Sequence, residues 1–409
     1  MELAEVVEPE MKRNRGLVVL RRNTDSLNCV TFPASLRFAF GENGTDGADA
    51  AQRGTIFRRL DLVHPDIVPH RRHASGDSYR IPITLKDGIP SRRTGMLALG
   101  IDIGTTQIKA GMVDNHGAIL ASRTIETPPD LEGFVPALHE AIRWLTEATA
   151  QPEGVGIGCK GMINQQNTEV EVLPGALHYL EGLRLSDLVG LPLEVPVFAD
   201  NDARVALAGE MVWGAARDFQ DVIMLTLGKG VGGAALVGGR LLRGHAGVAG
   251  HLGHMTIDPD GPPCACGNRG CLETFFSARA IEGEAWAAVH RGCPSVLRKL
   301  FREQPQLATC RTIFQAASEG DELSKSIVAK ATHSLAAAIA GLLHIFDPQI
   351  VILGGHVADA GADLLVPLQE EVWTRSRGLL GRDVPLVEQQ VADKSGIVGA
   401  AGLVMAPRG

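Results

Sequence analysis

One histidine and three cysteines near the middle of the chain are the residues whose types and spacing point most clearly to chemistry. His254, Cys264, Cys266 and Cys271 follow one another closely, and glycines among the cysteines allow tight turns. Four nitrogen and sulfur ligands are the set that a closed, tetrahedral zinc site requires, and the metal stabilises the thiolate form of each cysteine. The run therefore predicts a structural zinc site; the alternative is a Gly-rich loop beside a core histidine.

The composition limits the classes of protein that need consideration. The chain has 409 residues, a formal net charge of −8 and 4% aromatic residues, which is long enough for two or three domains. The acidic balance argues against a general nucleic-acid binder. No apolar run approaches the ~20 residues that span a bilayer, and the N-terminus lacks a signal-peptide pattern. The cysteines outside the zinc set fit reduced thiols. We therefore expect a cytoplasmic protein without nucleic-acid or membrane partners.

Residues 1–95 differ from the rest of the chain. They contain the polar, turn-rich stretches GENGTDGADA and PHRRHASGDS, and no long stretch has a helical period. This pattern predicts a disordered leader. Because Met96 directly opens the regular part of the sequence, the alternative is that translation starts there and the upstream stretch is a gene-model artefact.

From Met96 onward the pattern is α/β. An apolar strand ending at Asp102, a Gly-Thr-Thr turn and the segments QIKAGMVD and AILASRTIE predict three strands, followed by a helix and a further strand. The succession of strand, Gly-rich turn, strand, turn and strand recurs from Asp221, which indicates a duplicated lobe. A long Ala/Leu-rich helix is expected at about 324–346. We assign residues 96–200 to an N-terminal lobe, 201–390 to a C-terminal lobe with the zinc loop 254–271, and 391–409 to a C-terminal helix that packs back on the N-terminal lobe.

The segment from Gly253 to Glu273, G-H-x9-C-x-C-G-x-x-G-C-x-E, resembles the signature of the ROK family of sugar kinases and repressors. The resemblance extends from about Met96 to the C-terminus. It implies a duplicated two-lobe α/β fold of the actin/hexokinase-like (ribonuclease H-like) type, with ATP and Mg²⁺ between the lobes. It also implies that the zinc braces the sugar pocket, and that a homodimer is possible. ROK repressors carry an N-terminal helix-turn-helix, and residues 1–95 show no pair of amphipathic helices joined by a short turn.

Two Gly-rich turns could hold phosphates through backbone N–H groups. In GIDIGTTQIKAG, Asp102 could hold Mg²⁺ through water and Lys109 could offset phosphate charge. The second turn is LGKGVGG, and the Gly-Gly pair after QIVIL resembles the turn that contacts adenosine. Lys229 stands where the family usually has Thr; it could meet phosphate as a point charge or turn into solvent. The predicted nucleotide-binding residues are Asp102, Gly104, Thr105, Thr106, Lys109, Gly228, Lys229, Gly230, Gly232, Gly354 and Gly355.

The segment FADNDARVALAGE places Asn201 and Asp202 just after a strand. An Asn-Asp pair could be a turn and helix cap. By resemblance, Asp202 is the catalytic base and Asn201 a sugar ligand, and a carboxylate can accept the proton of an attacking hydroxyl. The predicted substrate-binding residues are Gly161, Asn201, Asp202, His251, His254 and Glu273.

Two departures from the family pattern leave the sugar open. His251 replaces the usual Glu of G-E-x-G-H; a carboxylate accepts from two hydroxyls, whereas a neutral imidazole accepts one hydrogen bond and donates one. Lys160 stands where Pro is common. We expect a glucokinase-like ATP-dependent kinase that converts glucose to glucose 6-phosphate. The alternatives are a kinase of N-acetylmannosamine or another hexosamine, a sugar-responsive transcriptional regulator without kinase activity, and a degenerate sugar-binding protein.

Overall fold

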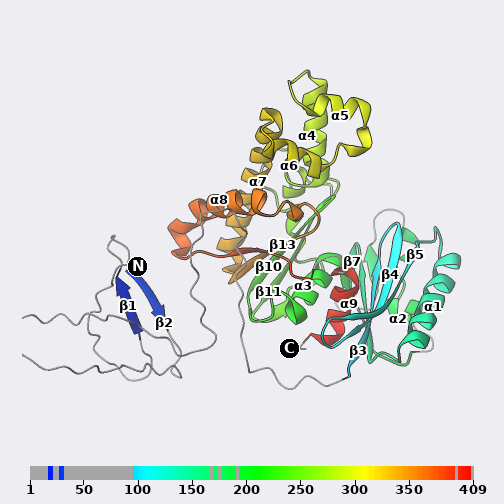
Figure 1. Cartoon of the computed structure of the whole chain (residues 1–409). Helices are drawn as coiled ribbons and strands as arrows, with labels where there is room; N and C mark the ends of the chain where they lie inside the picture. The colour runs from blue at the N-terminus through cyan, green and yellow to red at the C-terminus, as the bar shows by residue number, and fades with distance from the viewer. Residues whose placement is uncertain are drawn as a thin grey trace, which may run out of the picture. The chain divides into compact units, whose positions relative to one another are not determined.

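The computed structural model describes residues 95–164, 169–172, 177–189, 193–391 and 395–406, and the backbone of two short strands near the N-terminus (Figure 1). These strands, β1 (Leu17–Arg21) and β2 (Leu27–Thr31), pair antiparallel. The chain divides into one unit of residues 1–88 and a second of residues 89–409. Apart from the two strands, the predictions made for residues 1–95 lie outside the described residues. All the motifs that predict chemistry belong to the second unit.

The N-terminal lobe is built on a five-stranded mixed sheet with the order β5-β4-β3-β6-β9. Its first three strands form an antiparallel meander, and β6 and β9 extend the sheet parallel to β3. Asp130 caps α1 by accepting a hydrogen bond from the Gly133 backbone, and the apolar face of the helix is buried at helical spacing, as the sequence predicted. The elements are β3 (Leu97–Ile103), β4 (Gln107–Asp114), β5 (Ile119–Glu126), α1 (Leu131–Ala148), β6 (Gly154–Cys159), β7 (Met162–Ile163), β8 (Val170–Val172), η1 (His178–Leu180), α2 (Leu185–Val189) and β9 (Val197–Asn201).

The C-terminal lobe repeats this strand order in a second sheet, β12-β11-β10-β13-β14. Again an antiparallel meander comes first, and two later strands extend the sheet parallel to its first strand. The strands are β10 (Val222–Leu227), β11 (Val231–Val237), β12 (Arg240–Leu241), β13 (Ile350–Gly354) and β14 (Leu386–Glu388). The duplication predicted from the two strand–turn–strand runs is therefore present in the sheet topology.

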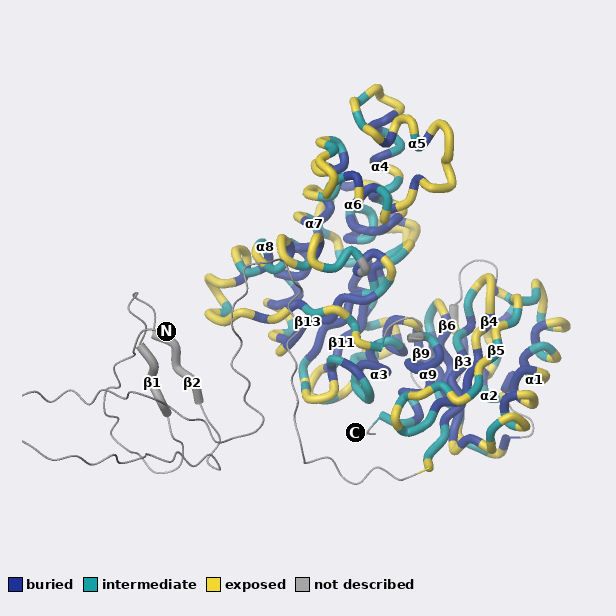
Figure 2. The backbone as a smooth tube through the Cα atoms, in the orientation of Figure 1, coloured by how far each residue is buried: buried dark blue, intermediate teal, exposed yellow. Residues whose placement is uncertain are grey.

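Helices of the C-terminal lobe pack around α7, the long helix that the sequence predicted. α7 contacts α4, α6 and α8, and much of it is buried (Figure 2). Its core residues include Leu335, Ile339 and Leu343. By length and composition alone α7 could cross a membrane, which inspection of the sequence did not reveal. Its burial in the lobe identifies it as a core helix. The helical elements are η2 (Leu252–His254), η3 (Leu272–Thr274), α4 (Ala278–His290), α5 (Leu297–Glu303), η4 (Pro305–Leu307), α6 (Cys310–Ser318), α7 (Glu322–Phe346), η5 (Ala358–Ala360) and α8 (Ala362–Leu380).

Two helices, α3 (Asp202–Trp213) and α9 (Ser395–Met405), pack against each other and against the sheets. α9 lies so close to β3 and β6 that side chains are excluded: a Cβ added at Gly156 would lie 1.7 Å from the carbonyl oxygen of Ala400. α3 contacts β11 of the second sheet as well as β6 and β9 of the first. The N-terminus of α3, where Asp202 lies, is thereby fixed relative to both sheets.

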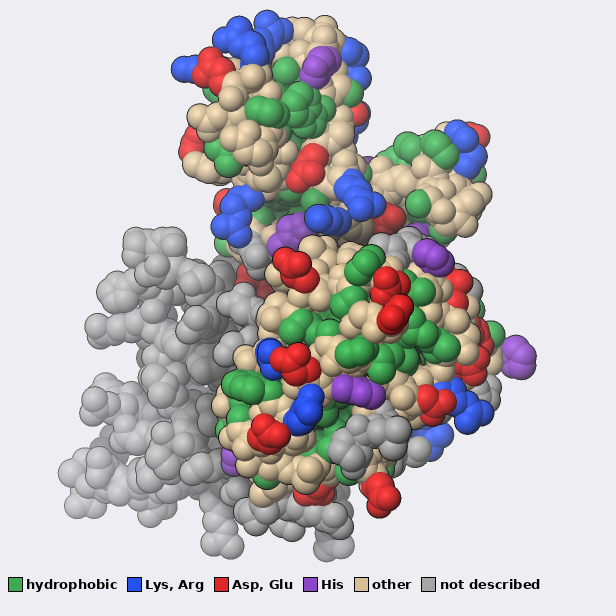
Figure 3. Space-filling model, turned by 90° about the vertical axis from the view of Figure 1, so that its right-hand side faces the viewer, with side chains coloured by type: hydrophobic (Ala, Val, Ile, Leu, Met, Phe, Trp, Pro, Cys, Tyr) green, Lys and Arg blue, Asp and Glu red, His purple; other side chains and the backbone are tan. Residues whose placement is uncertain are grey.

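The face in Figure 3 carries acidic and basic side chains interspersed over the described surface. The described surface also carries exposed ion pairs, for example Arg123 with Glu140 and Lys325 with Glu322. Such pairs contribute about 0–1 kcal/mol each, because water screens both charges. The stability of the fold therefore depends on its buried contacts.

Glu210 connects α3 to the segment that leads into α9, and its loss is expected to destabilise the protein. Its fully buried carboxylate accepts hydrogen bonds from the backbone N–H groups of Ala215, Gln390 and Val391 at 2.6–2.9 Å. Glu210→Gln replaces one acceptor oxygen by an NH₂ group that faces a backbone donor. We expect a loss of about 1–3 kcal/mol in the free energy of unfolding, measured by urea denaturation. An unchanged denaturation midpoint would contradict this role.

Candidate active site

The first Gly-rich turn joins β3 to β4. The Gly104 N–H donates to the Gln107 carbonyl at 3.0 Å, and the Thr127 hydroxyl donates to the Gly104 carbonyl at 2.8 Å. Thr105 and Thr106 are exposed at the tip. Asp102, at the end of β3, pairs with Lys109 across the hairpin. Burial raises the pKa of Asp102, and the Lys109 charge opposes this rise. The turn thus presents backbone donors and hydroxyls beside a carboxyl group and an ammonium group.

The second Gly-rich turn joins β10 to β11 and is braced by its neighbours. The Val231 N–H donates to a carboxylate oxygen of Glu273 at 2.8 Å, and the Ala278 N–H donates to the Gly228 carbonyl. Lys229 is exposed at the tip. Glu273, predicted to bind sugar, is therefore bound to the second turn through at least one oxygen.

The Gly354-Gly355 pair passes directly over the end of β10. Gly355 has a φ of 85°, and the Val357 N–H donates to the Leu227 carbonyl at 2.9 Å. A Cβ added at Gly228 would lie 3.4 Å from the His356 ring. The structure thus brings the Gly-Gly turn and the second Gly-rich turn together.

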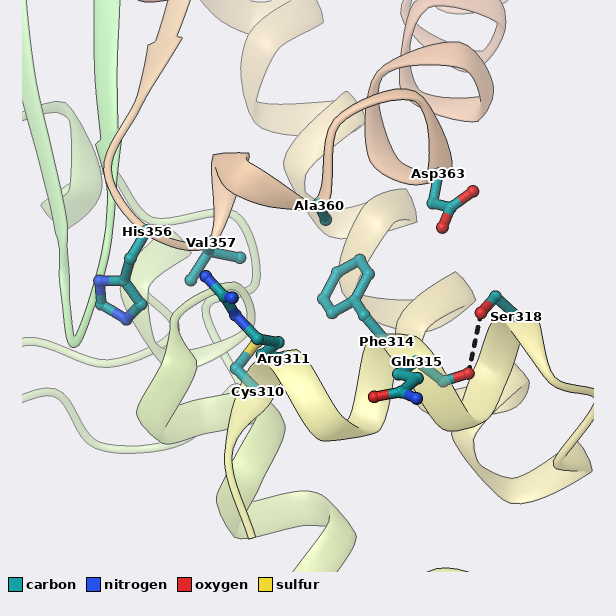
Figure 4. A pocket seen from close by; sticks show the side chains of 9 residues that line it. All are labelled: Cys310, Arg311, Phe314, Gln315, Ser318, His356, Val357, Ala360 and Asp363. Atoms are coloured by element: carbon teal, nitrogen blue, oxygen red, sulfur yellow. Dashed lines mark hydrogen bonds between the residues drawn. The ribbon is translucent and has the colours of Figure 1, made fainter. Parts of the chain in front are cut away.

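A pocket of about 260 Å³ opens beside this Gly-Gly turn (Figure 4). α6 contributes Cys310, Arg311 and Phe314 to its wall, and the segment after β13 contributes His356 and Val357. Burial raises the pKa of the Cys310 thiol to about 12, so this cysteine remains protonated. Sequence reasoning missed the pocket because α6 carries no recognisable motif. The ring of Phe314 and the guanidinium group of Arg311 could together accommodate a flat, polar group.

Asp202 begins α3 at the carboxyl end of β9. Its side chain has exposed area, yet surrounding protein desolvates the carboxylate and raises its pKa; the charge of Lys160 and the Ala203 N–H oppose the rise. A Cβ added at Gly232 would lie 3.2 Å from the Cβ of Ala203. Asp202 is therefore adjacent to the strand that leaves the second Gly-rich turn.

Asn201 is the N-cap of α3. Its side-chain oxygen accepts from the Ala203 N–H at 3.0 Å, and its side-chain nitrogen donates to the Gly161 carbonyl at 3.0 Å. Gly161 has a φ of 96°, which allows the bend after β6. The helix cap that the Asn-Asp pair could form is thus present in the structure, and Asn201 holds Gly161 close to Asp202.

His254, Cys264, Cys266 and Cys271 come together, with ligand atoms all within 4.8 Å of one another. The Cys266 and Cys271 sulfurs are 3.7 Å apart, and the Cys264 sulfur is 3.5 Å from Nδ1 of His254. A tetrahedral zinc with Zn–S bonds of about 2.3 Å and Zn–N bonds of about 2.0–2.1 Å has edges of about 3.8 and 3.6 Å. The cluster therefore fits zinc. A hydrogen bond from the Asn268 backbone lowers the pKa of Cys266, whereas burial raises that of Cys271 to about 12.

His251 lies near Asp202, close enough for its charge to act on that carboxylate. Its Nδ1 is 2.7 Å from the Val248 carbonyl oxygen, so Nδ1 carries a proton and donates. In the neutral ring, Nε2 is then left as a hydrogen-bond acceptor. Three residues after His251, His254 joins the cluster with the three cysteines, so the two histidines are held by one short segment.

A buried charge network, which sequence reasoning missed, supports this segment. Asp200 is fully buried, with both carboxylate oxygens engaged by Arg204 and Arg243. Arg204 also donates to the carbonyls of Gly247 and Ala249 at 2.9 and 2.8 Å. The strand before Asp202 and the loop before His251 are therefore joined by charge-assisted hydrogen bonds. The only sign of this network in the sequence is that Asp200 and Arg204 are four residues apart, a spacing at which two side chains can form an ion pair.

Comparison with known proteins identifies the family. The model of the ROK family matches residues 98–406. The chain belongs to the ROK family. Glucokinase from Thermotoga maritima is 34% identical over 308 residues, covering 75% of this chain and 96% of that protein. N-acetylmannosamine kinase from Citrobacter koseri is 36% identical over 273 residues, covering 64% and 84%.

A solved ROK structure supports the same assignment. The ROK glucokinase from Streptomyces griseus, in complex with glucose and AMPPNP, is 35% identical with a TM-score of 0.63 and covers 75% of this chain and 98% of that protein. The motif-based resemblance to the ROK family is thus confirmed, and the α/β fold is that of this family.

Proposed function

We propose that this ROK protein transfers the terminal phosphoryl group of ATP to a hydroxyl of a hexose, with glucose to glucose 6-phosphate as its main reaction. The observation that carries the proposal is the position of Asp202 between the two Gly-rich turns. The sheet register brings it near the first turn, and the Gly232–Ala203 approach brings it near the second. Similarity to the glucokinases of T. maritima and S. griseus supports the same activity.

The two turns would hold the nucleotide. Backbone N–H groups at Thr105–Thr106 and Lys229–Gly230 would face the phosphates, and Lys109 and Lys229 would add positive charge. The pocket between Phe314 and the His356–Val357 segment would hold the base. Mg²⁺ bound by the phosphates, and by Asp102 through water, would neutralise part of the phosphate charge.

Asp202 would act on the sugar. Its carboxylate would accept a hydrogen bond from the attacking hydroxyl, orient the hydroxyl oxygen toward the terminal phosphorus, and accept the proton as the new P–O bond forms. The raised pKa of Asp202 suits this role, because a more basic carboxylate is a better proton acceptor.

A structural zinc at His254, Cys264, Cys266 and Cys271 would keep the sugar side of the site in place. The spacing of the four ligand atoms supports this assignment. The same loop carries Glu273, whose carboxylate binds the second Gly-rich turn. The metal would therefore fix the position of the sugar-facing residues and of a phosphate turn together.

His251 would select among sugars. With Nδ1 donating to Val248, the neutral ring offers one acceptor, whereas a glutamate would offer two oxygens. We expect His251→Glu to raise the ratio of kcat/KM for glucose to kcat/KM for N-acetylmannosamine by about three- to tenfold. This is the change expected from one additional hydrogen bond to the sugar, which contributes about 0.5–1.5 kcal/mol. Steady-state kinetics on both sugars would measure this ratio. His290→Glu, on the exposed end of α4, is the control, and equal ratios in both variants would exclude His251 from sugar selection.

The second candidate is a hexosamine kinase with the same mechanism, favoured by His251 and by the similarity to N-acetylmannosamine kinase of C. koseri. Neither a regulator nor a degenerate sugar-binding protein would require a carboxylate at Asp202 close to both Gly-rich turns.

We further propose a cytoplasmic location, which suits free thiols, and a homodimer.

An ADP-release assay over a panel of hexoses and N-acylated hexosamines tests the function. We expect ADP release that depends on sugar and Mg²⁺, with glucose giving the highest kcat/KM. A higher value with N-acetylmannosamine would select the second candidate. Sugar binding without ADP release, measured by calorimetry, would favour the regulator or the degenerate binding protein.

A further inference from the structure

Lys160 follows directly after β6, the strand between β3 and β9. The last residue of β6, Cys159, is paired with Ile103 on one side and with Asn201 on the other. Gly104, Lys160 and Asp202 are the residues that directly follow the ends of these three strands. Adjacent strands lie about 4.8 Å apart, so Lys160 comes between the first Gly-rich turn and Asp202. The three residues form one row across the carboxyl edge of the sheet.

The charge of Lys160 is available at this edge. Its side chain is exposed, and no hydrogen bond or ion pair joins it to another residue in the described part of the chain. The groups that its charge influences are nevertheless those of the site: it lowers the pKa values of both Asp102 and Asp202 against the stronger effect of burial. Among the described residues, Lys160 is therefore a cation without an ion pair whose charge acts on two carboxyl groups.

We propose that Lys160 is a catalytic residue of the phosphoryl transfer proposed above, in which its ammonium group contacts the phosphoryl group as it moves to the sugar oxygen. The inference rests on that proposed function. In the step, the bond from the terminal phosphorus to the bridging oxygen breaks, and its electron pair remains on ADP. The sugar oxygen forms the new bond to phosphorus and its proton passes to Asp202. Lys160 keeps its own proton throughout.

Electrostatics explains why a cation is useful at this position. The carboxylate of Asp202 and the phosphate oxygens carry charges of the same sign, and they must approach each other when the sugar hydroxyl lies between them. A positive charge in the same row reduces this repulsion. A flexible lysine can also follow the phosphoryl group as it moves between the two oxygens. Removal of a comparable group that stabilises transition-state charge lowers turnover by about 10²–10³-fold in other enzymes.

The test compares Lys160→Met with the matched control Lys299→Met, an exposed lysine on α5. With glucose present, calorimetry measures the binding of Mg²⁺ complexes of AMPPNP, which has a third phosphoryl-like group, and of ADP, which lacks it. We expect Lys160→Met to weaken AMPPNP binding about tenfold while ADP binding changes less than twofold, since one charged hydrogen bond is lost. We expect kcat to fall about 10²-fold with the sugar KM nearly unchanged. Lys160→Arg, which keeps the charge, should lie between the wild type and Lys160→Met.

The outcomes separate this inference from the proposed function. Equal weakening of AMPPNP and ADP, or none, would overturn the role of Lys160 even in an active enzyme. The wild type could bind AMPPNP more tightly than Lys160→Met does and still form no sugar phosphate. That result would overturn the proposed function but support the contact between Lys160 and the terminal phosphate. Thermal unfolding of each variant shows whether the substitution destabilises the protein. An equal decrease of Tm in Lys160→Met and Lys160→Arg would mean that Lys160 has a structural role instead of a catalytic one.

Discussion

Asp202→Asn is expected to lower kcat by about 10²-fold or more while leaving sugar affinity nearly unchanged. The amide keeps the size and the hydrogen bond to the Ala203 N–H that Asp202 makes at 2.9 Å, but it cannot accept the hydroxyl proton. Steady-state kinetics gives kcat, and calorimetry gives sugar affinity. Turnover equal to that of the wild type would exclude Asp202 as the base.

The pH dependence of the same pair of proteins adds a second check. Burial raises the pKa of Asp202 above the usual value of about 3.9, and only the ionised form can accept a proton. In the wild type, kcat/KM should therefore fall as the pH decreases through this raised pKa, at a higher pH than for a well-solvated aspartate. Asp202→Asn should lack this acid limb in its residual activity. An acid limb that is identical in both proteins would assign the titration to another group.

Loss of the metal is expected to have the second largest effect, on thermal stability and on the sugar KM. Purified protein should contain one zinc per chain, and Cys266→Ser should lose it. Cys266 is exposed, so this substitution removes a ligand without disturbing the core. Structural zinc binds with about 10–16 kcal/mol in small peptides, and loss of one ligand should lower Tm by about 10 °C. The sugar KM should rise as well, because the loop also carries Glu273.

Cys293→Ser is the matched control for the zinc prediction, since Cys293 lies outside the cluster. It should retain zinc, Tm and activity. Elemental analysis together with thermal unfolding provides the comparison. Fully active wild-type protein without zinc, or zinc retained at full occupancy in Cys266→Ser, would contradict the assignment.

The sequence predicted the features that depend on residues close to one another along the chain. The cysteines and His254 are close in the chain, so their convergence required only a tight loop. The two hairpins with their Gly-rich turns were likewise readable from short runs, and their repetition indicated the duplicated sheet order. The long helix α7 followed from its Ala/Leu pattern, although the sequence did not reveal how apolar it is as a whole.

The features that could not be predicted depend on distant partners. Glu210 binds backbone groups at 390 and 391, and Asp200 and Arg204 are joined to Arg243 and to a loop beyond it. The pocket wall from α6 has no motif, and its position depends on how that helix packs. Lys160 was visible as a departure from the family pattern. Its place between a phosphate turn and Asp202 follows only from the register of β6 with both neighbouring strands.

Phosphorus NMR of the full chain with Mg²⁺, ATP and glucose tests the central claim most directly. We predict that ATP is converted to ADP and that one glucose 6-phosphate appears for each ADP formed, with both products forming about 10²-fold or more slowly in Asp202→Asn. Inorganic phosphate in place of the sugar phosphate, or equal product formation by the wild type and Asp202→Asn, would contradict the account.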